Sequence, residues 1–140
     1  MAFKVFLDAN VLLDFTLQRE KYEVSKSLMQ GIINGDFQAF ITPSIVHITG
    51  YWLTKAYGAA KAKEILLNLL TDIKIIDCSH KITVTALSSA MVDIEDALQY
   101  YTALDHKLDF FISRDKQLQK VAIPNLPVYL PENFLDDLAQ

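Results

Sequence analysis

Phe3-Lys4-Val5-Phe6-Leu7-Asp8-Ala9-Asn10 is the stretch that decides the fold of this chain. Its first five residues form a short, largely apolar run that predicts a buried β-strand, and Asp8 follows immediately. Asn10 is placed to start a helix that continues through residues 11–17. In an open parallel α/β sheet, ligands bind at the carboxyl ends of the strands. We therefore expect Asp8 to lie at a ligand site.

Two further acidic segments occur where a strand ends or a helix begins. Val92-Asp93-Ile94-Glu95-Asp96 leads into a helix predicted over residues 96–104, and Phe111-Ile112-Ser113-Arg114-Asp115 closes a short strand. Parallel strands bring their carboxyl ends to one edge of the sheet, so acids far apart in sequence can converge there. Converging carboxylates repel one another unless a hard cation lies between them. The three segments together predict a divalent-metal site.

Asp8, Asp96 and Asp115 are the candidate metal ligands and catalytic residues, and Asp93 is an additional candidate ligand. Asp93 and Asp96 are three residues apart at a helix start, which puts both on one face, whereas Glu95 is expected to point elsewhere. Supporting roles are predicted for two further polar residues, Asn10 as a hydrogen-bonding companion of Asp8 and Ser113 as a group that orients a ligand water.

Each of these acids also has a purely structural interpretation. Asp8 could be the N-cap of the first helix, a role that Asn10 could fill equally well, and Asp115 could cap a helical turn over residues 116–120. Asp93 and Asp96 could merely complement a helix dipole, which is worth about 0.3–1 kcal/mol for each acid. Sequence alone leaves both interpretations open.

The rest of the chain alternates short apolar runs with amphipathic segments, which predicts βα crossovers and a parallel sheet covered by helices on both faces. We expect one α/β domain over residues 1–140, three layers deep. The predicted strands are residues 3–7, 37–41, 73–76, 109–112 and 127–129. The predicted helices, besides the two already given, are residues 22–33, 45–56, 61–70, 81–91 and 131–135.

Composition restricts the class of protein. The 140 residues are 51% hydrophobic, enough for a sizeable core, and the net charge of −4 argues against a broad basic face that grips nucleic acid. An enzyme that acts on nucleic acid through bound cations is still compatible with this charge. No apolar run approaches the ~20 residues of a membrane span, and the lone Cys78 excludes an internal disulfide. We expect a cytoplasmic protein with no membrane contact.

Four segments in order resemble a PIN domain of the kind found in VapC-type toxin ribonucleases. They are Val5 to Asp14, Asp93 to Tyr100, Phe111 to Asp115, and Tyr129-Leu130-Pro131-Glu132-Asn133-Phe134-Leu135, and the resemblance extends in order over essentially the whole chain. The resemblance implies a PIN-like fold and an endoribonuclease that uses Mg²⁺ or Mn²⁺ to hydrolyse RNA. It also implies a toxin of a type II toxin–antitoxin pair, with a small antitoxin partner and a homodimeric state.

Residue by residue, the resemblance matches Asp8, Asp96 and Asp115 to the family's metal-binding aspartates, and Ser113 to the Ser or Thr that precedes the last of them. One position departs from the pattern. The family usually has a Glu early in the helix after the second strand, where this chain has Ile48. Asp93 could compensate for that acid. The alternative is a catalytically degenerate PIN-like module that binds RNA or a protein partner without cleaving.

Two other hypotheses concern assembly and class. Apolar and aromatic side chains beyond what one small sheet can cover favour a homodimer. A phosphoacceptor receiver-type domain would also put an acid after the first strand, but by resemblance it needs an acidic neighbour of Asp8 and a Lys after residues 127–129, and neither is present. The side chains proposed for the dimer contact are Tyr51, Trp52, Ile65, Leu66, Leu69 and Leu70.

Overall fold

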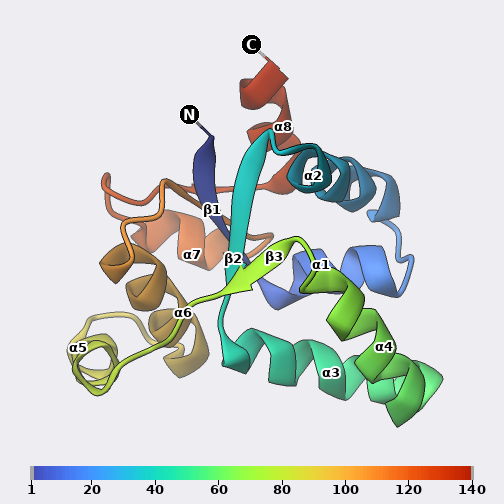
Figure 1. Cartoon of the computed structure of the whole chain (residues 1–140). Coiled ribbons are helices and arrows are strands. Elements are labelled where there is room, and N and C mark those ends of the chain that lie inside the picture. Colours follow the sequence, from blue (N-terminus) through green and yellow to red (C-terminus); the bar gives the residue numbers. More distant parts are fainter. Residues whose placement is uncertain (1, 140) are drawn as a thin grey trace.

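Five parallel strands form the centre of the computed structural model, which describes residues 2–139 (Figure 1). The strands are β1 (Phe3–Leu7), β2 (Phe37–Ile41), β3 (Ile73–Ile75), β4 (Phe110–Ile112) and β5 (Val128–Tyr129). The helices are α1 (Ala9–Thr16), α2 (Tyr22–Asn34), α3 (Pro43–Tyr57), α4 (Ala59–Leu69), α5 (His80–Ser88), α6 (Ile94–Asp105), α7 (Lys116–Val121) and α8 (Pro131–Ala139).

The strand order β3-β2-β1-β4-β5 places a topological switch point between β1 and β4. From β1 the chain moves outward through β2 to β3, then returns to the other side of β1 for β4 and β5. Leu7 pairs with Ile112 in register, so β1 and β4 end at the same level. In folds of this kind, the crossovers diverge on either side of this point, and ligands bind in the crevice beyond the carboxyl ends of the two strands.

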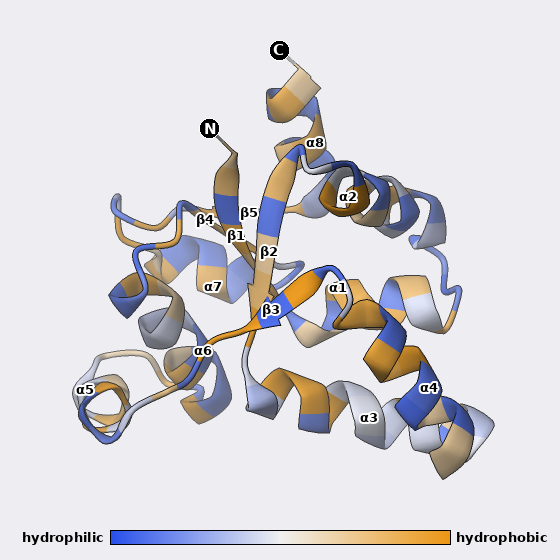
Figure 2. Ribbon diagram, viewed as in Figure 1, coloured by the Kyte–Doolittle hydropathy of each residue, from blue (hydrophilic) through white to orange (hydrophobic). Residues whose placement is uncertain are grey.

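The core lies on both faces of the central strands. Val5, Phe6 and Leu7 are fully buried, and the Phe6 ring stacks on Phe111 of β4 with 4.8 Å between ring centroids. A strand buried on both faces needs a continuous apolar run rather than an alternating one, which explains the composition of β1. Figure 2 shows hydrophobic colour over much of the strands, whereas the helices mix hydrophobic and hydrophilic residues.

Helices flank the sheet on both sides, as the sequence predicts. In Figure 1, α1, α2 and α4 lie on one side of β1 and β2, and α5, α6 and α7 lie on the other. The predicted three-layer α/β architecture is confirmed. Within residues 2–139, no helix is long and apolar enough to cross a membrane.

Several predicted boundaries are wrong by a few residues, and two of them affect the site. The helix predicted to run to Met91 ends at Ser88, because the Ser89 side chain donates to the Ala86 carbonyl (2.7 Å) and accepts from the Met91 amide (3.3 Å). The following helix begins at Ile94 rather than at Asp96. A short loop therefore delivers the acids of residues 93–96 to the start of α6.

The apolar side chains proposed for a dimer contact divide into two groups. Leu69 is buried in the main core, so its inclusion was wrong, and Ile65, Leu66 and Leu70 are half-buried against the core. Tyr51 and Trp52 are the exposed members, 53% and 48% accessible, and their rings meet edge to face. Only these two aromatic residues of α3 remain as an uncovered apolar surface from that set.

Candidate active site

Asp8 is the first acid of the site and has two structural roles at once. It follows the buried end of β1, and its backbone amide still donates to the Ile112 carbonyl of β4 (3.1 Å). Its Oδ1 accepts from the Ala9 amide (2.8 Å), so Asp8, and not Asn10, is the N-cap of α1. Its Oδ2 accepts from the Ser113 hydroxyl (2.7 Å), across the switch point. Capping and site interpretations are therefore compatible for this residue.

The turn after β4 supplies the second group. Ser113 is fully buried, and its Oγ accepts from the Asp115 amide (3.0 Å) while it donates to Asp8. Asp115 then caps α7, because its Oδ1 accepts from the amides of Gln117 (2.9 Å) and Leu118 (3.3 Å). Ser113 thus links the two aspartates, a closer role than the predicted orientation of a water.

The third group lies at the start of α6. Asp93 is the N-cap, and its Oδ1 accepts from the Asp96 amide (2.9 Å). The pKa of Asp96 is raised to about 7, first by burial, then by a hydrogen bond with the Asp115 carboxyl, then by the charges of Asp93, Asp115 and Asp8. Burial and nearby carboxylates both disfavour the ionised form of Asp96, which indicates a surplus of negative charge around this residue. Asp96 therefore lies within electrostatic reach of both Asp115 and Asp8.

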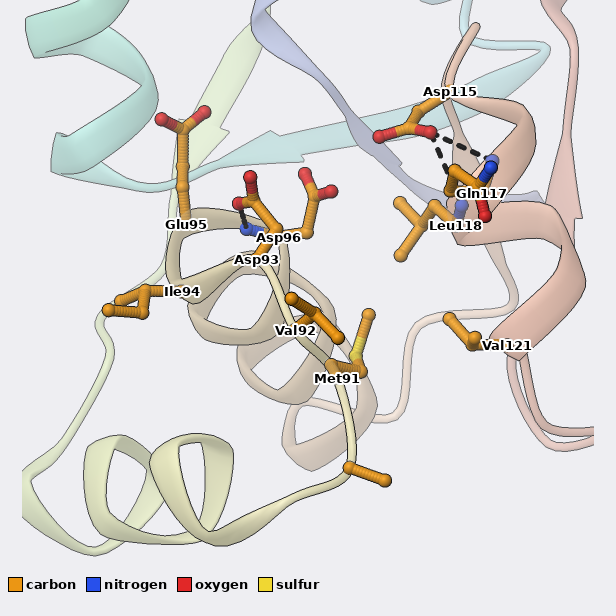
Figure 3. Close-up of a pocket in the computed structure, with 11 residues that line it drawn as sticks. Met91, Val92, Asp93, Ile94, Glu95, Asp96, Asp115, Gln117, Leu118 and Val121 are labelled. Carbon is orange, nitrogen blue, oxygen red and sulfur yellow. Dashed lines mark hydrogen bonds between the residues drawn. The ribbon is translucent and has the colours of Figure 1, made fainter.

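Glu95 is a site residue that the sequence analysis missed. Burial raises the pKa of Glu95, and the charges of Asp8 and Asp93 raise it further, so its carboxyl lies within electrostatic reach of Asp8. Figure 3 shows the carboxyl groups of Asp93, Glu95 and Asp96 directed the same way from the start of α6. In the first turn of a helix that faces the crevice, a long side chain can reach the site from a neighbouring face. Helical spacing alone gave the wrong direction for Glu95.

The pKa of Asp8 is also raised, mainly by burial and to a smaller extent by neighbouring acids. Burial raises the pKa of Asp8, the hydrogen bonds from Ser113 and Ala9 oppose that rise, and the charges of Asp115 and Asp93 add to it. A group that accepts two hydrogen bonds would ordinarily be more acidic. Its raised pKa indicates that these two donors do not offset the effect of burial together with the charges of Asp115 and Asp93.

A cavity of about 760 Å³ lies beside the acids (Figure 3). One wall is apolar and is formed by side chains from the α5–α6 loop and from α7, while the acids of α6 and Asp115 line the other part. The apolar wall includes Met91, Val92, Leu118 and Val121. A cavity with an apolar wall and converging polar groups is the usual form of a small-ligand site.

Asn10 and Ile48, the other two positions from the sequence analysis, have contacts of their own. The Asn10 side-chain oxygen accepts from Arg19 (3.4 Å), and its backbone carbonyl accepts from the same guanidinium (3.0 Å). Ile48 is half-buried and packs against the core. The start of its helix is tied to α6, because the Thr42 hydroxyl donates to Oε1 of Gln99 (2.6 Å). Residues 44–50 contribute no carboxylate to the site.

The donors at this site suit a hard cation, although no cage for one is preformed. Among residues 2–139, no group of three or more His, Cys, Asp or Glu side chains is arranged so that it could hold a metal ion directly. The available ligands are carboxylate and hydroxyl oxygens, which Mg²⁺ and Mn²⁺ prefer. Mg²⁺ usually keeps several waters and is bound through one or two carboxylates, so it does not require such a cage.

A family profile described as the PIN domain matches residues 4–117. The chain belongs to the PIN domain family. That range includes β1 and the start of α6, as well as the turn after β4, so it spans every acid of the site. No curated protein matches the chain.

Solved structures with this PIN fold are similar over most of their length. VapBC2 from Rickettsia felis, bound to a DNA fragment from its promoter, is 17% identical with a TM-score of 0.66, over 91% of this chain and 98% of that one. A toxin–antitoxin complex from Klebsiella pneumoniae is 21% identical with a TM-score of 0.67, over 91% and 97%. VapC20 from Mycobacterium tuberculosis, a sarcin–ricin loop cleaving toxin, is 10% identical with a TM-score of 0.68, over 86% and 97%. These likenesses establish the fold.

Proposed function

We propose that this PIN domain is a metal-dependent endoribonuclease of the VapC type. The proposal is supported by the electrostatic coupling of Asp96 to Asp115 and Asp8, which helps raise the pKa of Asp96 to about 7, and by Ser113, which bonds both Asp8 and Asp115. A site that is too negative by itself is suited to a divalent cation, because the cation relieves the repulsion. PIN domains are typically nucleases, and the solved relative VapC20 is described as a toxin that cleaves the sarcin–ricin loop.

The residues divide the work in a defined way. Asp8, Asp96 and Asp115 would hold Mg²⁺ or Mn²⁺, and Ser113 keeps Asp8 and Asp115 in a fixed relation through its hydroxyl. The cation, when bound, supplies an activated water and neutralises the charge that develops on the phosphate during hydrolysis. Near neutral pH, deprotonation of Asp96 completes the set of charged ligands. The apolar wall beside the acids offers a surface for the RNA strand.

Glu95 and Asp93 take the place of the acid that is absent from α3. Both carboxyls line the cavity beside Asp96, and Glu95 is coupled electrostatically to Asp8. They would accept hydrogen bonds from waters that complete the coordination of the cation. In this proposal, acids at the start of α6 replace the Glu that the family usually has at the position of Ile48 in α3.

The test is cleavage of a mixed pool of end-labelled RNA in the presence of Mn²⁺. Wild type should cleave, and Asp8→Asn, Asp96→Asn and Asp115→Asn should each lose activity while staying folded. The control is Asp136→Asn, which removes an exposed carboxyl from α8. If one of these three variants retains full metal-dependent activity, the aspartate that it lacks has only a structural role.

A second candidate function is a PIN module that binds RNA or a protein partner without cleaving it. The missing carboxylate in α3, together with the lack of a preformed metal cage within residues 2–139, favours this alternative. The two functions differ in their response to metal. Ligand binding to the native state must raise the melting temperature, so a melting temperature that millimolar Mn²⁺ leaves unchanged would favour the second.

The proposal includes partners. The structures from Klebsiella pneumoniae and Salmonella typhimurium are described as a toxin–antitoxin complex and as DNA-bound VapBC. We infer that this chain is the toxin of such a pair, held inactive by a small antitoxin, and that it forms a homodimer. A short open reading frame directly upstream of its gene would support the first inference.

A further inference from the structure

Arg114 lies between two residues of the site and has a separate set of partners. Its Nε donates to Oδ2 of Asp14 (2.7 Å), and its Nη1 donates to Oε1 of Glu132 (2.9 Å). Ser113 and Asp115, on either side, face Asp8 and the α6 acids. The turn after β4 is therefore attached to the protein on two sides.

Asp14 is the centre of the attachment. It is only 5% exposed, and it pairs with two cations, because Arg19 Nε and Nη2 also contact its Oδ1 at 3.0 and 2.9 Å. A buried carboxylate is tolerated only when it is paired and hydrogen-bonded. Asp14 belongs to α1, the helix that Asp8 caps. The Arg114 pair thus joins the turn to the same helix that Asp8 caps.

Two bonds consequently define how the turn sits on α1. At the start of α1, the Ser113 hydroxyl donates to Asp8. Further along the same helix, Arg114 pairs with Asp14. Glu132 adds a third point, on α8. We propose that Arg114 is a positioning residue that fixes Asp115 relative to Asp8 and so sets the affinity of the metal site. The proposal rests on the proposed function, since it concerns the same site.

Arginine is suited to this position in a way that lysine is not. A planar guanidinium can donate from different nitrogens to two carboxylates on different elements, whereas an ammonium acts as a single point charge. Nη2 of Arg114 is buried and makes no hydrogen bond within residues 2–139, so the attachment depends on Nε and Nη1. Arg114→Gln removes the ion pairs with Asp14 and Glu132, and Arg114→Lys should not restore both of them.

Arg19 provides a matched control. Arg19→Gln also removes an ion pair with Asp14, but Arg19 precedes α2 and, within residues 2–139, makes no direct hydrogen bond to the turn after β4. Because Asp14 keeps one arginine in either variant, both proteins should fold. Glu132→Gln is a milder variant, because it removes only the ion pair between Arg114 and α8.

The experiment measures Mn²⁺ affinity by calorimetry, and hydrogen exchange of the Asp115 amide, which donates to Ser113 Oγ. Arg114→Gln and Arg114→Lys should weaken Mn²⁺ binding roughly 10–100-fold, as expected when a group that orients ligands is lost, and should speed exchange at Asp115. Arg19→Gln should leave both unchanged, and Glu132→Gln should fall between.

Two results would overturn the positioning role. One is equal weakening by Arg19→Gln and Arg114→Gln, which would mean that the ion pairs only stabilise the fold. The other is wild-type exchange at Asp115 in Arg114→Gln. If wild type itself fails to bind Mn²⁺, the proposed function fails, and the exchange rates still decide whether Arg114 holds the turn.

Discussion

Replacing Asp96 with asparagine should stabilise the metal-free protein at neutral to alkaline pH. The folded-state pKa of Asp96 is about 7 against the usual 3.8, so folding favours the protonated form. Between these two values the native state binds more protons than the unfolded state, and stability falls as pH rises through this window. Asparagine is isosteric with the protonated acid and cannot ionise, so the variant escapes this loss.

The magnitude follows from the same two values. The full difference in pKa corresponds to an upper bound of about 4 kcal/mol. Asp96 borders an open cavity, and solvent screening lowers the gain to roughly 1–2 kcal/mol. For a chain of this length, that corresponds to a rise in melting temperature of about 3–6 °C.

The assay is thermal unfolding in EDTA at about pH 8 and again at about pH 4, where position 96 is uncharged in both native proteins and most of the difference should disappear. Asp136→Asn is the control for loss of a surface charge. An Asp96→Asn variant that melts at or below wild type at the higher pH would refute the charge surplus inferred for the site, as would a gain of equal size at both pH values.

Three further outcomes are expected. Glu95→Gln should weaken Mn²⁺ binding less than Asp8→Asn does, because Glu95 would bind the waters around the cation and not the cation itself. A Kd equal to that of wild type would show that Glu95 has no role in the site. Ile48→Glu should raise the affinity for Mn²⁺ and should raise the melting temperature only when metal is present, since α3 begins beside α6. A large loss of stability both with and without Mn²⁺ would show that the core does not tolerate a carboxylate at Ile48. Sedimentation at micromolar concentration should give a dimer, with Tyr51 and Trp52 in the contact, and a clean monomer would contradict this.

The sequence predicts those parts of the fold that local patterns determine. The bounds of β1 and β2 agree with the structure to the residue, because a continuous apolar run between polar residues has one interpretation. Asp8 is correctly placed, since a residue that ends a buried strand of a parallel sheet must lie at its carboxyl edge. The early end of α5 was missed because it depends on hydrogen bonds of Ser89 that no periodicity reveals.

Contacts between distant segments account for what the sequence could not show. Arg114 and Asp14 are a hundred residues apart, and nothing in either segment indicates the pair. Leu69 resembles a surface residue of an amphipathic helix until the packing of α4 is known. The direction of Glu95 depends on how the first turn of α6 meets the crevice, which helical spacing does not define.

Proton release on metal binding tests the central claim most directly. Calorimetric titration of wild type with Mn²⁺ at about pH 6, in two buffers of different ionisation enthalpy, measures the number of protons displaced. Asp96 is mostly protonated there, so Mn²⁺ should displace close to one proton from wild type and almost none from Asp96→Asn. Absence of Mn²⁺ binding at millimolar concentration, or binding without proton release in wild type, would contradict a cation site built on Asp8, Asp96 and Asp115.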